Sequence, residues 1–323
     1  MTLPTCLISA ALIAVAVCAM PAAAADRTTF TLRAFVENDD NVALISDDAF
    51  GAEPLSSTGA GLMLGVSRSL HRTSTFELRG SINAFHTRQL NSDAEDFDVA
   101  GVVPRISLTK RMSFASRPTT FAASVNLRRD WLGGEAYSRL IDMGGSLQVF
   151  VTPAWSIGPS YTISSRDYDD EGFDPEVTSR NALRHTLGFT SQLLLPSPVG
   201  ARAPTRLSLS ASAQRNDADG SDFEFAGVVY GMQLEVPLTA RSAAAFSDLG
   251  MQLSVSSVDI DYDDFAALPK RSDQRLTASL ALSALWNPLG RLDLSYTRFV
   301  IDSNRPEYEA SRNLLRFGVT YSF

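Results

Sequence analysis

Apolar and polar side chains alternate along most of the chain with a period of two residues. Successive side chains of a strand point to opposite faces, so this pattern predicts strands with one apolar and one polar face. In one clear case, Phe121, Ala123 and Val125 alternate with Ser124 and Asn126. Fourteen such segments recur, at 28–36, 59–70, 74–87, 97–110, 119–131, 138–151, 154–167, 181–194, 204–216, 223–237, 248–260, 274–286, 290–301 and 310–323.

The connections between these segments alternate between short and long. Short links at 71–73 and 152–153 contrast with long links at 37–57, 168–180 and 261–273. The long links are rich in aspartate, whereas the short ones favour arginine and lysine. Bacterial outer-membrane barrels have this asymmetry, with short periplasmic turns and longer outer loops. We therefore expect seven outer loops with an acidic rim, and both chain ends in the periplasm.

The pattern predicts an all-β protein, a closed up-and-down antiparallel transmembrane β-barrel of about 14 strands. Strands of about 9–11 residues are needed to cross the hydrocarbon of a membrane. A soluble β-sandwich also alternates, but it needs a shared core of large apolar residues, and many apolar positions here are only alanine, leucine or valine. Pro104 and Pro159 fall inside predicted strands, where the missing N–H breaks a ladder, so we expect bulges there.

Residues 1–25 have the features of a signal peptide. Leu7–Ala19 is an apolar run too short to span a bilayer, and Pro21 is followed by four alanines that end at Ala25. We expect cleavage near Ala25, an outer-membrane location in a Gram-negative cell, and a single barrel domain at 26–323. Beyond residue 25, no stretch approaches the ~18 consecutive apolar residues expected of a membrane helix.

Composition excludes several classes of chemistry. The net charge of −8, from 28 basic and 36 acidic residues, argues against nucleic acid as a partner. Both cysteines lie in the leader, which leaves no thiol for the mature protein. The three histidines, His71, His86 and His185, lie too far apart in sequence to suggest a metal-binding pair. We predict no catalytic residue, no metal and no cofactor.

Arginine dominates the charge of the polar face. Taken literally, the alternation places a set of charged residues there, as pore-lining candidates: Arg33, Arg79, Arg105, Arg128, Arg184, Arg206, Arg312, Arg316, Glu77 and Asp293, with Glu224 as a further carboxylate. In a water-filled pore such an excess favours anions, because a low-dielectric wall focuses the field of fixed charges. The alternative is that these arginines pair with carboxylates across the lumen and rigidify the wall.

The carboxyl end has an aromatic face suited to lipid. One face of the last predicted strand carries Leu315, Phe317, Val319, Tyr321 and Phe323, which occupy alternate positions. This end resembles the β-signal by which outer-membrane proteins are recognised. The resemblance implies the barrel assembly machinery as a partner, with Tyr321 and Phe323 as the assembly signal.

Several motifs resemble the barrel of the surface lipoprotein assembly modifier family. They are Leu292-Asp293-Leu294-Ser295-Tyr296, Asp302-Ser303-Asn304, Tyr308, Ser311-Arg312-Asn313, the final Phe323, and the early Asn38-Asp39-Asp40-Asn41-Val42. The resemblance implies a fourteen-stranded barrel that delivers lipoproteins to the cell surface. Members of that family carry a helical repeat domain ahead of the barrel, and this chain shows no helical repeat period.

The sequence thus predicts passage across the outer membrane, as surface lipoprotein export or as its accessory pore. An anion-preferring channel for small solutes is the alternative. A hydrolase at the outer rim is a further alternative, because some outer-membrane hydrolases place a histidine among acidic residues there, and His86 and His185 should lie near that rim. The expected partners are outer-membrane lipid and lipopolysaccharide, and either a lipoprotein cargo or a small anionic solute.

Overall fold

The computed structural model describes residues 28–43, 54–169, 179–197, 203–238, 247–263 and 270–323. The predicted leader, its cleavage near Ala25 and parts of the acidic loops lie outside these ranges. Fourteen strands occupy almost all of the described chain. Their bounds are β1 Thr28–Asp39, β2 Ser57–Arg72, β3 Phe76–Gln89, β4 Val99–Phe114, β5 Arg117–Leu132, β6 Glu135–Thr152, β7 Trp155–Tyr168, β8 Ala182–Leu195, β9 Thr205–Ala218, β10 Phe225–Pro237, β11 Ser247–Tyr262, β12 Ser272–Leu285, β13 Gly290–Ser303 and β14 Ala310–Ser322.

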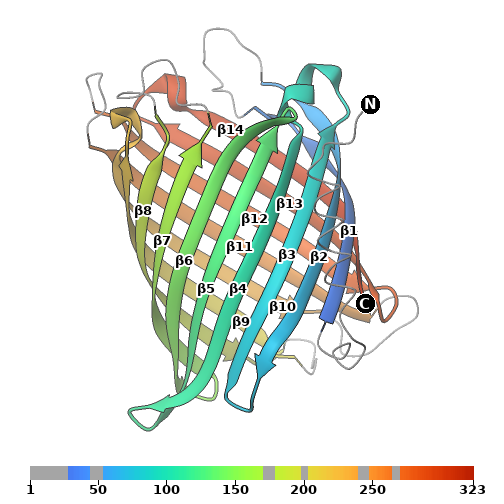
Figure 1. Ribbon diagram of the computed structural model, residues 1–323, viewed down its shortest axis with the longest axis vertical. Helices are drawn as coiled ribbons and strands as arrows, with labels where there is room; N and C mark the ends of the chain where they lie inside the picture. The colour runs from blue at the N-terminus through green and yellow to red at the C-terminus, as the bar shows by residue number, and fades with distance from the viewer. Residues whose placement is uncertain (1–27, 44–53, 170–178, 198–202, 239–246, 264–269) are drawn as a thin grey trace.

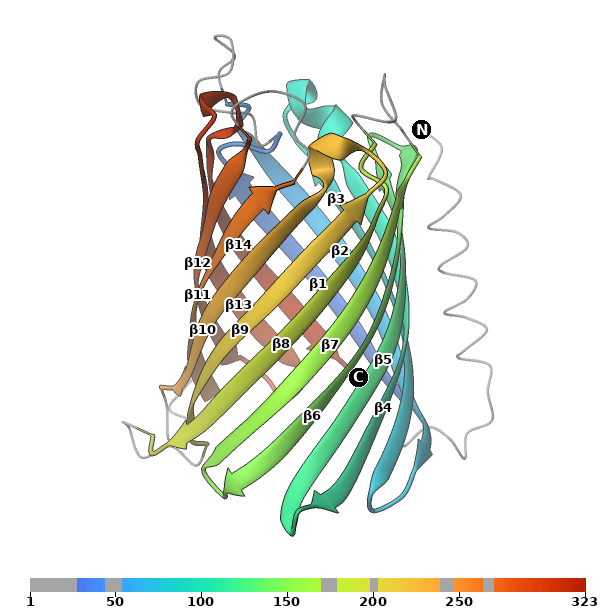
Figure 2. The ribbon, with the colours of Figure 1, turned by 90° about the vertical axis from the view of Figure 1, so that its left-hand side faces the viewer.

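The strands form one closed barrel. Each strand pairs antiparallel with its neighbours in sequence, and β1 pairs antiparallel with β14 to close the sheet. Figures 1 and 2 show the strands tilted around a common axis, as closure of a sheet requires. The predicted fold class and strand number are confirmed, and the sandwich alternative is wrong because there is one closed sheet rather than two stacked ones.

The two ends of the barrel differ in their connections. We call the end where β1 begins and β14 finishes the terminal end, and the opposite end the loop end. The short 3-10 helices η2 (Ser92–Phe97), η3 (Ser221–Phe223) and η4 (Pro306–Tyr308) all lie in links at the loop end (Figure 2). The expected contrast in loop length is incomplete, because Gly133 and Gly134 alone join β5 to β6 there. Their positive φ angles of 57° and 90° suit a tight turn that glycine forms without strain.

The two prolines within strands cause no register shift. The β4–β5 pairs Val102↔Arg129 and Arg105↔Asn126 keep one register on either side of Pro104. The β6–β7 pairs likewise keep one register on either side of Pro159. The expectation of bulges at these prolines is therefore wrong. Register shifts lie instead near strand ends, between Ser69/His71, Asp130/Trp131, Phe150/Thr152 and Ser247/Gly250.

The seam between β1 and β14 is fastened at the loop end by two of the sequence motifs. Asp39, which is 1 % exposed, pairs with the guanidinium of Arg312. The Asp40 carboxylate accepts hydrogen bonds of 2.6 Å from the backbone N–H and the side-chain amide of Asn313. Asn41 donates its side-chain amide to the Ser311 carbonyl at 2.9 Å. Segments 38–42 and 311–313 thus act together as a clasp that closes the barrel.

Breaking this clasp should destabilise the barrel at its seam. We expect Arg312→Gln to lower the free energy of unfolding by about 2 kcal/mol, because the buried Asp39 carboxylate loses charged hydrogen bonds. Urea titration in detergent measures the loss, and hydrogen exchange locates it in the β1 amides. Arg298→Gln is the control, since Arg298 is an exposed arginine on β13. Equal losses in both variants would contradict the role of the clasp.

Candidate functional site

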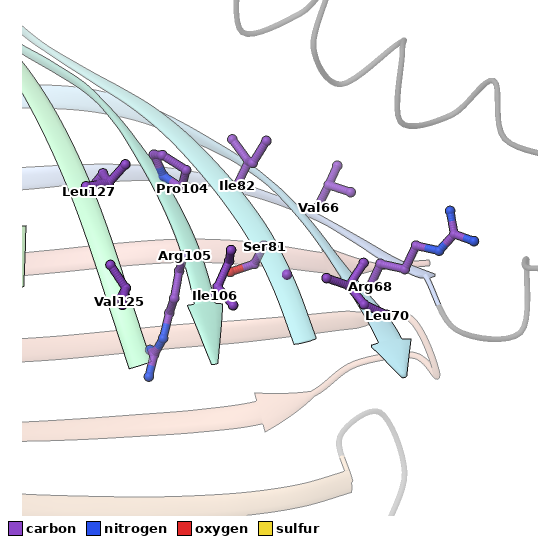
Figure 3. A pocket seen from close by; sticks show the side chains of 11 residues that line it. Val66, Arg68, Leu70, Ser81, Ile82, Pro104, Arg105, Ile106, Val125 and Leu127 are labelled. Carbon is purple, nitrogen blue, oxygen red and sulfur yellow. The ribbon is translucent and has the colours of Figure 1, made fainter. Parts of the chain in front are cut away.

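The outer face of the barrel is apolar and open to its surroundings. Leu187 is 62 % exposed and Ile106 is 56 % exposed, although both lie in the middle of strands. Figure 3 shows part of this face, where Val66, Ile82 and Pro104 line a shallow hollow of about 340 Å³. Large apolar side chains in this arrangement need an apolar surrounding medium. Among the described residues, no helix is long and apolar enough to cross a membrane.

Aromatic side chains gather on the outer face at the terminal end. Trp155 donates its indole N–H to the Ser191 hydroxyl at 3.1 Å. The rings of Trp286 and Tyr321 meet edge to face at 5.8 Å, and Tyr321 stacks on Phe323 at 6.3 Å. Aromatic rings with a polar atom are favoured where hydrocarbon meets water. The residues proposed as an assembly signal therefore belong to an aromatic band at this end of the barrel.

The opposite face of every strand points into the barrel and is polar. In β14, Leu315 and Phe317 are exposed on the outside, so Arg312 and Arg316 point inward. The same parity applied to each strand turns all ten of the charged residues singled out from the sequence to the inner face. These are Arg33, Arg79, Arg105, Arg128, Arg184, Arg206, Arg312, Arg316, Glu77 and Asp293.

Five of these eight arginines hold a carboxylate beside them. Two pairs lie within a strand, Arg79 with Glu77 and Arg128 with Asp130, each at 2.8 Å. The others join neighbouring strands and are Arg206–Glu235 at 3.0 Å, Arg316–Glu37 at 2.5 Å and Arg312–Asp39. The pairs therefore lie along the wall rather than across the lumen, so they stiffen the sheet without bridging the interior.

The other three predicted arginines have no carboxylate within ion-pair distance in the described part of the chain. They are Arg33, Arg105 and Arg184, and Arg166 of β7 shares this condition. The Nε atoms of Arg33 and Arg166 are buried without a hydrogen-bond partner. Arg184 donates its Nε–H to the Asn216 side chain at 3.1 Å. These four guanidinium groups leave uncompensated positive charge on the inner face.

Arg166 and Arg184 are close neighbours. Arg166 pairs in register with Ala182 and Arg184 pairs with Ser164, which makes the two arginines diagonal neighbours on the inner face. Electrostatic repulsion acts on Arg184 from both Arg166 and Arg275. The sequence analysis did not include Arg166 and Arg275 among the inward arginines. Each alternates in step with the serines and threonines of its own strand, and this pattern could have identified both.

The inner face also carries more carboxylates than the sequence suggested. Asp142 accepts a hydrogen bond from the Ser164 hydroxyl at 2.5 Å, and Asp293 accepts one from Thr320 at 3.1 Å. The prediction that Glu224 lies on the inner face is wrong. It lies in the β9–β10 link and pairs at 3.0 Å with Arg215, which points outward, so it belongs to the rim.

A buried charged cluster lines the inner face at the loop end, and we call it the Asp273 cluster. It consists of Tyr262, Arg271, Asp273, Arg275, Ser303 and Tyr308. The Asp273 side chain is fully buried, and it binds Arg271 at 2.6 Å and Arg275 at 3.1 Å. It also accepts hydrogen bonds from the Ser303 hydroxyl at 2.8 Å and the Tyr262 hydroxyl at 3.2 Å. The guanidinium of Arg271 lies 3.6 Å from the Tyr308 ring centroid, which draws η4 onto the barrel.

Apolar packing extends this cluster. Phe225, Ile260 and Tyr262 are buried together, with Tyr308 packed against them. This is ordinary side-chain packing inside the barrel, and it occupies the inner face between β10 and β13 at the loop end.

Outside the strands, Glu307 forms a 2.8 Å pair with Arg305. A hydrogen bond from its own backbone N–H, together with Arg305, lowers the pKa of Glu307 below its ordinary value.

Two histidines proposed as catalytic bases point away from the lumen. His86 lies on the outer face, opposite Leu62 and Ala100 in the neighbouring strands. His185 also points outward, and its Nδ1 shares a 2.7 Å hydrogen bond with the Tyr161 hydroxyl. Within the described ranges, neither histidine hydrogen-bonds to a carboxylate, and no cluster of histidine and acidic residues could hold a metal ion. The expectation of a histidine set among rim aspartates is not met at either position.

Several solved bacterial structures are similar to this chain at low sequence identity. No protein family model and no curated protein matches the chain. OccAB3 of Acinetobacter baumannii is 10 % identical, with 92 % of this chain and 98 % of that chain covered and a TM-score of 0.47. A bacterial polysaccharide outer membrane secretin is 12 % identical over 91 % and 98 %, with a TM-score of 0.46. Pseudomonas aeruginosa OpdK with vanillate is 10 % identical over 92 % and 98 %, with a TM-score of 0.44.

Proposed function

We propose that this protein is an outer-membrane channel that prefers small anions. The observation that carries the proposal is the presence of inward arginines without a carboxylate within ion-pair distance in the described chain, among them Arg33, Arg105, Arg166 and Arg184. Asp142 and Asp293, the inward carboxylates outside ion pairs, are each engaged by a hydroxyl group. The fixed charge of the inner wall is therefore positive on balance.

A charged wall of this kind selects ions by its field. The surrounding hydrocarbon has a low dielectric constant, so the field of the guanidinium groups is concentrated in the aqueous interior. A barrel of 14 strands is intermediate between an eight-stranded barrel filled by side chains and an open porin of 16 strands. We expect an interior wide enough for small hydrated solutes and narrow enough for the arginines to exclude cations.

Placement in the outer membrane is supported by the outer face and by strand length. The strands contain 12 to 18 residues, more than the ~9–11 needed to cross the hydrocarbon. The aromatic band of Trp155, Trp286 and Tyr321 fits the membrane interface on the periplasmic side. In this proposal the signal peptide is removed near Ala25, and the closing strand with Tyr321 and Phe323 is read by the barrel assembly machinery.

Surface lipoprotein export is the alternative function, and only the sequence motifs support it. Those motifs have a structural role in the described residues, since segments 38–42 and 311–313 form the clasp of the barrel. Export and solute passage differ in their readouts. A chain that conducts no ions but places a co-expressed lipoprotein on the cell surface would support export.

Ion selectivity in planar bilayers tests the proposed channel. We expect the wild type to give discrete conductance steps and a reversal potential that indicates anion preference under a potassium chloride gradient. Neutralising four unpaired arginines with Arg33→Gln, Arg105→Gln, Arg166→Gln and Arg184→Gln together should strongly reduce that preference. The control is the double variant Glu77→Gln and Arg79→Gln, which removes an ion pair and leaves the net charge unchanged. Cation preference in the wild type, or no conductance, would overturn the proposal.

A further inference from the structure

The inner wall contains a recess whose polar lining consists mainly of hydroxyl groups. It has a volume of about 310 Å³ and lies on β4, β5, β6 and β7. Its polar side chains are Arg105, Ser107, Thr109, Ser124, Ser146, Ser160 and Thr162. The register brings Ser107 opposite Ser124 and Ser146 opposite Ser160, so hydroxyl groups from four strands converge on one surface.

The recess exists because its floor lacks large side chains. Gly144 and Ala122 fill the inward positions between the serines. A Cβ atom on Gly144 would lie 2.9 Å from the Thr162 hydroxyl, closer than real contacts allow. The floor is therefore set by the backbone itself at this point, and a bound solute can reach the hydroxyl groups around it.

Arg105 stands at one side of the recess with its guanidinium group available. Figure 3 shows Pro104 and Arg105 leaving β4 on opposite faces, with Pro104 on the outer surface. Arg105 is exposed to the lumen and has no ion-pair partner among the described residues. The nearest inward carboxylate at the same level is Asp142, which lies two strands away across Asn126 and is engaged by the Ser164 hydroxyl.

Resting on the channel function proposed above, we propose that this recess binds small carboxylates that carry several hydroxyl groups. A guanidinium group presents parallel N–H donors that match the two oxygens of a carboxylate. Serine and threonine hydroxyls both donate and accept, which suits the hydroxyl groups of a solute. No aromatic ring lines the recess, so its lining favours a hydrophilic solute over a flat aromatic one. The recess is then a selective step along the anion path.

Block of the chloride current by gluconate, compared with propionate, tests this inference. Both probes carry one carboxylate, and only gluconate carries a hydroxylated chain. In wild-type channels we expect gluconate to reduce the current at a concentration at least about tenfold lower than propionate does, because the hydroxyls add hydrogen bonds. Arg105→Gln should raise the blocking concentration of gluconate by about tenfold or more. The double variant Ser124→Ala and Ser146→Ala should weaken block by gluconate and leave block by propionate unchanged.

Arg33→Gln provides the matched control, because Arg33 is another inward arginine without an ion pair and lies on β1, away from the recess. It should change the blocking concentration of gluconate by less than about twofold. If the wild type conducts anions but gluconate and propionate block equally, or Arg105→Gln acts no more strongly than Arg33→Gln, the recess inference fails and the channel stands. If the wild type conducts nothing, the channel fails, and calorimetric titration of gluconate into the detergent-solubilised barrel decides the recess by the same variants.

Discussion

Replacement of Asp273 by alanine is expected to lower the free energy of unfolding by about 3–5 kcal/mol, the cost of breaking a buried ion pair by removing one partner. The Asp273 side chain is fully buried and binds both Arg271 and Arg275. Without it, two guanidinium groups remain together with no carboxylate between them, and the Ser303 and Tyr262 hydroxyls lose their acceptor. The urea midpoint of the folded barrel in detergent measures the change.

Asp302→Ala is the control for this prediction. Asp302 lies on β13, pairs in register with Gln274 and is exposed, so its loss should change stability by less than about 0.5 kcal/mol. Because η4 is held through the stacking of Arg271 on Tyr308, Asp273→Ala should also speed amide exchange in η4. A loss of stability no greater than that of Asp302→Ala would mean that the Asp273 cluster does not hold the loop end together.

The alternation of side chains was sufficient to predict the barrel and most strand bounds. A two-residue period is a local property, and a strand between hydrocarbon and water must show it along its whole length. The segment predicted at 181–194 is β8 at Ala182–Leu195, and the one predicted at 310–323 is β14 at Ala310–Ser322. The same parity also gave the direction of the eight arginines that were predicted to point inward, because a side chain's face follows from its position in the strand.

The ion pairs could not be predicted in the same way, because they depend on register between strands. Arg316 meets Glu37 only when β14 closes on β1, and these residues are far apart in sequence. The first strand was predicted to end at residue 36, which left Glu37 and Asp39 in a loop. Pairing with β14 extends β1 to Asp39 and turns both carboxylates to the inner face. The charge of the wall was therefore overestimated from single strands.

The lengths of the links and the effect of the prolines also depend on pairing between strands, which the sequence of one strand does not reveal. The segments predicted at 119–131 and 138–151 leave six residues between them, yet pairing continues until only Gly133 and Gly134 remain between β5 and β6. Pro104 interrupts hydrogen bonding without shifting the register, because the neighbouring pairs hold both strands in place. The long-range ladder decides such details, whereas propensity describes one residue at a time.

The backbones of two neighbouring strands are in close contact at Gly158, so we expect this position to tolerate no larger side chain. Gly158 lies on the inner face of β7, beside Pro159. A Cβ atom added there would lie 1.8 Å from the carbonyl oxygen of Leu147 in β6. The obstacle is backbone, so no side chain can rotate away, and β6 and β7 must separate. We expect Gly158→Ala to lower the free energy of unfolding by about 3 kcal/mol, at the upper end of overpacking costs, measured by urea titration of the refolded barrel.

Gly145→Ala is the matched control, because Gly145 lies on β6 within the same strand pair, and its added Cβ would lie 3.7 Å from the nearest atom, the carbonyl oxygen of Ala122. That is ordinary van der Waals contact, so stability should change by less than about 0.5 kcal/mol. Hydrogen exchange should show faster opening of the pairs Ser146↔Ser160 and Val149↔Ile157 in Gly158→Ala alone. Since Ser146 and Ser160 also line the hydroxyl recess, Gly158→Ala should in addition weaken block by gluconate. Equal stability of the two variants would show that β6 and β7 accommodate the methyl group without parting.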